Sequence, residues 1–159
     1  MKLKNTMLTL LLSISLIGTT YADYNDGLKY YNEGDYGQAF VEWSYMANQG
    51  YASAQYNLGW MYANGEGVAQ DDKQAVKWYR KAADQGYASA QSNLGWMYEN
   101  GKGVAQDDKQ AVKWYRKAAN QGHASAQFNL GLMYGAGKGV AQDDKQAVKW
   151  YRKAANQGR

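Results

Sequence analysis

Residues 50–85 read GYASAQYNLGWMYANGEGVAQDDKQAVKWYRKAADQ, and this stretch decides the fold because it occurs twice more along the chain. Residues 86–121 match it at 32 of 36 positions, and residues 122–157 match residues 86–121 at 31 of 36. A fixed period of about 20–50 residues marks a protein built from stacked structural repeats. A divergent fourth unit precedes the three, because Gly27 and Ala39 recur as Gly59 and Ala75 with a connection four residues shorter.

The spacing of apolar residues predicts two helices in each full unit. The first covers about residues 52–64, where Ala54, Leu58 and Met61 share one side of a helix. Gly65 ends it, since glycine takes the left-handed conformation after a helix at no steric cost. The second helix begins after Asp71, which lies three residues before a glutamine in a capping-box pattern, and runs to about residue 85.

A single hairpin of this kind cannot stand alone. Ordering its residues costs on the order of 1.5 kcal/mol each, and one apolar face offsets that only when another unit covers it. Small residues at Gly59, Ala75 and Ala82 allow the helices to approach closely. The sequence therefore predicts an all-α fold, an α-solenoid of four helix-turn-helix repeats and about eight helices.

The repeated motifs AQxNLGxMY, GxGV and AVKWYRKAA resemble those of Sel1-like repeats, a branch of the tetratricopeptide-type solenoids. The resemblance covers about residues 24–158. It implies right-handed superhelical stacking, with the first helix of each unit on a concave face and the second on the convex face. It also implies a protein-binding adaptor without chemistry of its own. Two departures are the stretch Val68-Ala69-Gln70, where the family often has proline, and the absence of cysteine, which excludes the cysteine-bridged branch linked to β-lactam binding.

The first 22 residues have the pattern of a secretory signal peptide. Lys2 and Lys4 precede an apolar run from Met7 to Ile17, which ends in small residues before Ala22. The run is too short for a membrane-spanning helix, so a retained anchor is the weaker alternative. We expect a repeat domain over residues 23–159, with units at about 23–49, 50–85, 86–121 and 122–158, no transmembrane segment in the mature chain, and a periplasmic or secreted location.

Composition and motifs argue against several classes of function. The chain has no cysteine, and the mature part carries a net charge of only +2, so neither a thiolate metal site nor strong attraction to nucleic acid is expected. His123 is the single histidine, and paired acids such as Asp71-Asp72 are explained as helix caps. We expect no catalytic residue, no cofactor and no metal site, and thus no enzyme.

Basic residues recur in each second helix and would form a stripe on the outer surface: Lys77, Arg80, Lys81, Lys113, Arg116, Lys117, Lys149, Arg152 and Lys153. Such a stripe could meet anionic lipid, lipopolysaccharide or another polyanion. Because the net charge is small, we favour the interpretation of a solvated helix face whose long stems cover apolar neighbours.

Differences among the three full units gather on one stripe of the first helix. Positions 56, 60 and 63 vary at a spacing of i, i+4, i+7, and position 64 continues the stripe, whereas the packing residues stay the same. Neutral drift at exposed sites is one explanation. Retained aromatic residues favour a ligand-binding groove instead, with nine candidate residues: Tyr56, Trp60, Asn64, Ser92, Trp96, Glu99, Asn100, Phe128 and Leu132.

These observations favour a non-enzymatic interaction module of the bacterial envelope or secreted space, which binds a peptide or protein segment in its concave groove. A self-associating envelope scaffold is the alternative, and an enzyme acting on cell-wall material is less favoured.

The last helix carries no polar cap, so we expect parts of Trp150, Tyr151 and Ala154 to be exposed. That end is a candidate surface for a homo-oligomer.

The signal pattern predicts that Asp23 is the first residue of the exported protein, because cleavage follows the small residue Ala22. Intact-mass measurement of the endogenous protein tests this. Retention of Met1 would contradict it.

Overall fold

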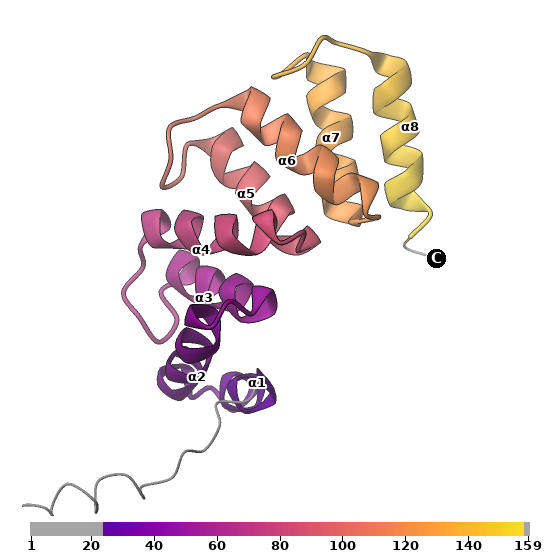
Figure 1. The fold of residues 1–159 in the computed structure, drawn as a ribbon. Helices are drawn as coiled ribbons and strands as arrows, with labels where there is room; N and C mark the ends of the chain where they lie inside the picture. The colour runs from indigo at the N-terminus through magenta and orange to yellow at the C-terminus, as the bar shows by residue number, and fades with distance from the viewer. Residues whose placement is uncertain (1–23, 158–159) are drawn as a thin grey trace, which may run out of the picture.

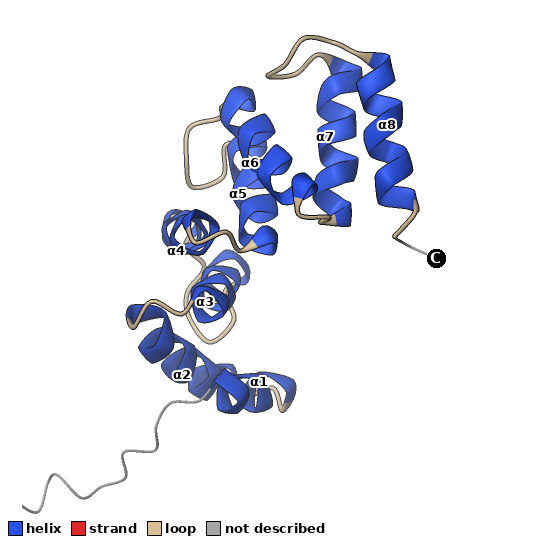
Figure 2. Cartoon of the chain, turned by 45° about the vertical axis from the view of Figure 1, so that its right-hand side comes forward, coloured by secondary structure: helices blue, strands red, loops and turns tan. Residues whose placement is uncertain are grey.

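The computed structural model describes residues 24–157, and that part of the chain forms eight helices and no strand (Figure 2). The predicted signal peptide lies outside the described residues. We call the first helix of each unit an A helix and the second a B helix. The A helices are α1 (Tyr24–Asn32), α3 (Ala52–Asn64), α5 (Ala88–Asn100) and α7 (Ala124–Ala136). The B helices are α2 (Tyr36–Asn48), α4 (Asp72–Asp84), α6 (Asp108–Asn120) and α8 (Asp144–Ala155).

Each helix packs against the helices before and after it, so the four hairpins follow one another along a curved row (Figure 1). The prediction of an all-α solenoid of eight helices is confirmed. The predicted bounds of the first helix in a unit agree with α3. The second helix ends one residue earlier than predicted, because Gln85 is the C-cap of α4 rather than its last turn.

The helix ends are set by the residues that the sequence singled out. The Asp71 side chain accepts hydrogen bonds from the backbone N–H groups of Lys73 and Gln74, at 2.9 and 3.0 Å. These bonds satisfy two of the donors that a helix N-terminus leaves without partners. Gly65 takes the left-handed conformation, with φ of +72°, and its N–H donates to the carbonyl of Met61.

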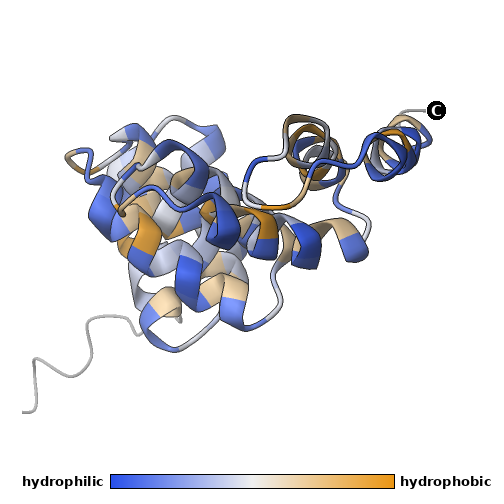
Figure 3. Cartoon of the chain, turned by 90° about the horizontal axis from the view of Figure 1, so that it is seen from above, coloured by the Kyte–Doolittle hydropathy of each residue, from blue (hydrophilic) through white to orange (hydrophobic). Residues whose placement is uncertain are grey.

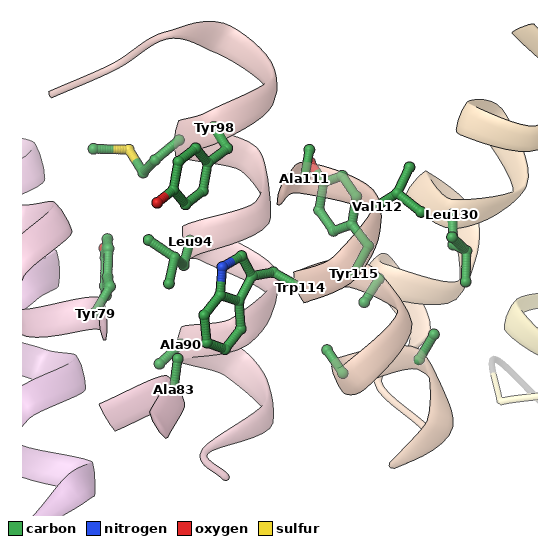
Figure 4. Close-up of a cluster of buried hydrophobic side chains, with 14 of the residues drawn as sticks. Tyr79, Ala83, Ala90, Leu94, Tyr98, Ala111, Val112, Trp114, Tyr115 and Leu130 are labelled. Atoms are coloured by element: carbon green, nitrogen blue, oxygen red, sulfur yellow. The ribbon is translucent and has the colours of Figure 1, made fainter. Parts of the chain in front are cut away.

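The core lies between the helices and is built from small residues facing large ones. Ala75, Ala82 and Leu94 are fully buried. Side chains from α4, α5, α6 and α7 meet in one cluster, where Trp114 of α6 points toward α5 (Figure 4). Hydrophobic and hydrophilic residues alternate around the helices (Figure 3), because each helix has a buried side and an exposed side.

Glycine in the middle of each A helix permits the closest approach in the hairpin. A Cβ built on Gly95 would lie 2.7 Å from Cδ1 of Tyr115, which is too close for two carbon atoms. Gly59 and Gly131 face Tyr79 and Tyr151 in the same way. The tyrosine ring of the B helix therefore occupies the space that any larger A-helix residue would need.

Buried glutamines join neighbouring hairpins, which the sequence analysis did not predict. The side-chain amide of Gln55 donates to the carbonyl of Ala47 in the preceding hairpin at 3.1 Å. Its oxygen accepts a hydrogen bond from the Gln85 amide at 2.8 Å. Gln91 and Gln127 repeat the arrangement. Each buried amide has partners for both its donor and its acceptor groups, which removes the cost of burying it.

The loop between the two helices of a unit is held against the preceding hairpin. Gly103 has φ of +65°, and any Cβ there would overlap the backbone carbonyl of Asp72 at the start of α4. Gly139 meets Asp108 of α6 in the same way. Glycine is thus needed here both for its positive φ and because the loop backbone lies directly against the backbone of the preceding unit. This contact positions a loop that lacks the proline common in similar repeats.

Replacing Gly95 by alanine should lower the free energy of unfolding by about 1–3 kcal/mol, because the new methyl group overlaps the ring of Tyr115. Gly37→Ala is the matched control, since its Cβ would meet only a side-chain oxygen of Asp35 at 3.7 Å. This control should be neutral or slightly stabilising, because alanine favours helix more than glycine does. Urea unfolding followed by circular dichroism measures both, and equal stability of the two variants would contradict the prediction.

Candidate functional site

Two exposed tryptophans of the predicted groove lie on either side of a cleft between α3 and α5. Trp60 is 40% exposed and Trp96 is 47% exposed, which is unusual for such large apolar side chains. The cleft has a volume of about 300 Å³, and we call it the tryptophan cleft. It is lined by Trp60, Ala63, Asn64, Gln70, Asp72, Tyr79, Asn93, Trp96, Met97 and Lys102.

A second cleft, of about 250 Å³, continues from Trp60 toward the first unit. Its lining includes Leu28, Tyr31 and Asn32 of α1, which the sequence analysis missed because the first unit diverges from the others. A signal was present: aligning Gly27 with Gly59 places these three residues at the positions of Trp60, Ala63 and Asn64. Extending the comparison of variable positions to the first unit would have found them.

Hydrogen bonds fix the side chains where the two clefts meet. The indole N–H of Trp60 donates to the hydroxyl oxygen of Tyr31 at 3.2 Å, and that hydroxyl donates to Oε2 of Glu66 at 2.8 Å. Burial and then the hydrogen bond to Glu66 raise the pKa of the Tyr31 hydroxyl. The exposed ring of Trp60 is thereby oriented before any ligand arrives, which lowers the entropy cost of binding.

Asn64 and Asn100 lie in the last turns of their A helices, as the variable stripe predicted. Their side-chain amides donate to the backbone carbonyls of Trp60 and Trp96 at 3.0 and 2.9 Å. Both asparagines are exposed. Each amide oxygen is left to accept a hydrogen bond from a ligand, because no described residue donates to it.

Three predicted groove residues are less available than the sequence indicated. Ser92 is 5% exposed, so little of its side chain is available to a ligand, because it is too short to reach the surface as Tyr56 does at the same position. Tyr56 is itself half-buried, with its ring centroid 5.2 Å from that of Tyr87. Glu99 accepts a 2.7 Å hydrogen bond from the Tyr115 hydroxyl, so one carboxylate oxygen already has an internal partner.

Phe128 and Leu132 are exposed, at 50% and 45%, but they do not line the tryptophan cleft. Phe128 packs on Tyr151 with ring centroids 5.6 Å apart. It borders a separate open hollow with Tyr151, Ala154 and Ala155 near the end of α8. The structure thus places Trp60, Asn64 and Trp96 in the tryptophan cleft, Tyr56 in the second cleft and Phe128 in a separate hollow, whereas Leu132 lines none of the three.

Two of the three residues of α8 that the sequence led us to expect at the surface are exposed in part. Tyr151 and Ala154 are partly exposed, as expected. Trp150 is 7% exposed, so its expected exposure is wrong. Its ring belongs to the buried cluster that includes Leu130 and Met133 of α7, and Lys153 lies over it with Nζ 4.5 Å from the ring centroid.

The single histidine of the sequence has a structural role. His123 caps α7, where its Nδ1 accepts a hydrogen bond from the N–H of Ala126 at 3.3 Å, and burial lowers the pKa of its imidazole. Across residues 24–157, His, Asp and Glu form no group that could hold a metal ion. No helix in this part of the chain is long and apolar enough to span a bilayer.

The sequence profile of the Sel1 repeat matches this chain three times, over residues 52–87, 88–123 and 124–158. The chain belongs to the Sel1 repeat family. Sel1 repeats generally mediate protein–protein interaction, and the family is typically non-catalytic.

Solved Sel1 repeat structures share this fold. The Sel1 repeat protein of Oxalobacter formigenes superposes with a TM-score of 0.82 and 40% identity, covering 86% of this chain and 56% of that protein. A protective antigen of uropathogenic Escherichia coli with an SLR fold superposes with a TM-score of 0.81 and 45% identity, covering 87% of this chain. Cysteine rich protein B of Helicobacter pylori superposes with a TM-score of 0.56 and 34% identity, covering 72% of this chain and 87% of that protein.

Among curated proteins, an exopolysaccharide production negative regulator of Rhizobium leguminosarum bv. viciae is 40% identical over 53 residues. The match covers 33% of this chain and 20% of the regulator. The chain thus spans a fifth of that relative, and 56% and 31% of the Oxalobacter and Escherichia proteins.

The Tyr115 hydroxyl, which is largely buried and donates a hydrogen bond to Glu99, makes the stability of the fold depend on pH. Burial, followed by this bond, raises the pKa of the Tyr115 hydroxyl well above its ordinary value of 10.0. The unfolded chain loses this proton near pH 10 while the folded protein keeps it. The free energy of unfolding should therefore fall above pH 10, by up to about 1.4 kcal/mol per pH unit for one such group.

Tyr115→Phe should make this decline less steep, with the remainder due to other buried tyrosines such as Tyr79, whose pKa burial also raises. Tyr45→Phe, which alters an exposed ring, should leave the decline unchanged. Urea-unfolding midpoints between pH 9 and 11.5 provide the comparison. The same slope in wild type and Tyr115→Phe would show that the buried hydroxyl does not control it.

Proposed function

We propose that the protein is a non-enzymatic adaptor of the bacterial envelope or secreted space, and that the two clefts beside Trp60 hold an extended segment of a protein partner. The observation that carries the proposal is the pair of exposed tryptophans on either side of the tryptophan cleft. Large aromatic residues in a partly enclosed cleft are the usual energetic anchors of protein interfaces.

The dimensions and chemistry of the clefts suit a peptide. Both clefts include Trp60, so a single chain crossing that ring contacts both. Neither volume is large enough for a folded domain, but each accommodates one or two side chains. Asn64 offers an amide oxygen in the lining of the tryptophan cleft, which could accept a hydrogen bond from a backbone N–H group of an extended segment.

Variation among the repeats supports a different subsite in each unit. Leu58, Met61 and Gly59 remain the same in every full unit because they pack the hairpin, whereas position 60 changes only from tryptophan to Leu132 in the last unit. A ligand that ran along the A helices would therefore meet two aromatic subsites followed by an aliphatic one. This order would distinguish one partner sequence from another.

Replacing Trp60 and Trp96 together by alanine should cost about 2 kcal/mol or more of affinity, a loss of roughly 30-fold, because both anchors are removed. The partner is first captured from envelope extract, and its binding segment is then made as a synthetic peptide for titration calorimetry. Lys77→Ala/Lys113→Ala is the matched control on the B helices and should change the affinity little.

Circular dichroism must show that both double variants keep the helical content of the wild type. Loss of binding in the lysine variant with full binding in the tryptophan variant would place the partner on the other face. A captured partner whose peptides fail to bind in the absence of the rest of that protein would contradict recognition of an extended segment.

A further inference from the structure

The formal charge is distributed unevenly along the solenoid. Residues 24–49 carry one lysine and four acids, a charge of −3, and residues 50–85 carry four cations and four acids, a charge of zero. Residues 86–121 carry five cations and three acids, a charge of +2, and residues 122–157 carry five cations and two acids, a charge of +3. The small net charge therefore conceals an acidic first unit and a basic second half.

Two repeat positions produce most of this change. Glu66 of the first full unit is replaced by Lys102 in the second, and Asp84 is replaced by Asn120. Both replacements remove a carboxylate, and one adds a cation. The basic residues of α4 therefore share their surface with an acid that α6 lacks.

On α6 the cations gather around an open hollow of about 480 Å³. Lys109, Lys113, Arg116 and Lys117 follow a spacing of i, i+4, i+7, i+8 and so share one helical face. Eight residues of helix span about 12 Å. The loop of the next unit forms the opposite wall through two residues, and no acid contributes to the lining: Lys109, Val112, Lys113, Arg116, Lys117, Asn120, Gly139 and Val140.

Contacts with aromatic side chains hold three of these cations, Lys113, Arg116 and Lys117, without neutralising them. Lys117 lies with Nζ 4.4 Å from the centroid of the Trp114 ring, and Lys113 lies at 5.7 Å from the same ring. The Arg116 guanidinium donates to the hydroxyl of Tyr134 at 3.0 Å. None of the four makes an ion pair with an acid in residues 24–157. Their charges are thus oriented in advance and available to an anion.

We infer that the hollow on α6 is a binding site for a soluble anion that carries several phosphate groups in a row. Phosphate groups match both kinds of cation present, because arginine binds them through two parallel hydrogen bonds and lysine binds them as a point charge. A row of four cations within about 12 Å requires a ligand of high charge density. A short phosphate chain has that density.

A membrane surface fits this face less well. Val112 and Trp114, which lie among the cations, are both 4% exposed, so α6 offers no large exposed apolar side chain on this face, and Val140 of the loop is only partly exposed. Surfaces that lie on membranes combine basic residues with exposed apolar ones. The site is separate from the tryptophan cleft, since it lies on a B helix and shares no lining residue with that cleft.

The chain contains its own control, because α4 carries the corresponding cations Lys73, Lys77, Arg80 and Lys81 but has Asp84 where α6 has Asn120. Binding of sodium tripolyphosphate to the full chain is measured by isothermal titration calorimetry at low salt. Lys113→Gln/Lys117→Gln should weaken binding tenfold or more, whereas Lys77→Gln/Lys81→Gln should weaken it less than threefold. Asn120→Asp should weaken it severalfold by placing a carboxylate in the hollow, and Asp84→Asn should add a second site on α4.

Equal losses in the two lysine double variants would show attraction to overall charge and overturn the site. Absence of tripolyphosphate binding would overturn it as well, and so would adsorption of the protein only to vesicles containing an anionic phospholipid. Trp60→Ala/Trp96→Ala should keep full tripolyphosphate binding, so failure of the proposed peptide cleft and failure of this site are separate results.

Discussion

The close approach between a glycine of each A helix and an aromatic ring of its B helix, tryptophan in the first unit and tyrosine in the other three, is the constraint on which the rest of the structure depends. Gly59, Gly95 and Gly131 leave room for Tyr79, Tyr115 and Tyr151, and no larger residue fits. This contact brings the helices of a hairpin together, and buried alanines around it let the next hairpin pack against them. Because a solenoid is stabilised by nearest-neighbour contacts, the three full units keep the same glycine and tyrosine, and the first unit keeps the glycine against Trp43.

Residues outside these contacts are free to differ, and the differences give each unit its own surface. On the A helices they place two exposed tryptophans around one cleft and an exposed leucine further along. On the B helices they replace an acid by an amide and leave a row of cations without an acidic partner. One scaffold thereby carries two chemically distinct faces, an aromatic face that suits a peptide and a basic face that suits an anion.

Much of the fold could be predicted from the sequence, because a repeated pattern reports the same packing three times. The caps at Asp71 and Gly65 were recognisable from residue type and spacing alone. The pairing of Gln55 with Gln85 was not, because those residues lie 30 positions apart and only the packing of α3 against α4 brings them together. Ser92 was wrongly expected at the surface, since a helical stripe indicates direction but not how far a side chain reaches.

The sequence by itself determined the helices, their order, the solenoid class and the stripe of variable residues. These follow from local spacing, since a helix places residues three and four apart on one face wherever it lies. Only the tertiary structure decided which of those residues share a cleft and that Trp60 bonds to Tyr31 of α1. It also decided that the cations of α6 line an open hollow whose opposite wall is the loop of the next unit. These relations depend on how one hairpin is rotated against the next. That rotation is set by the packing of side chains between units, which no single repeat contains.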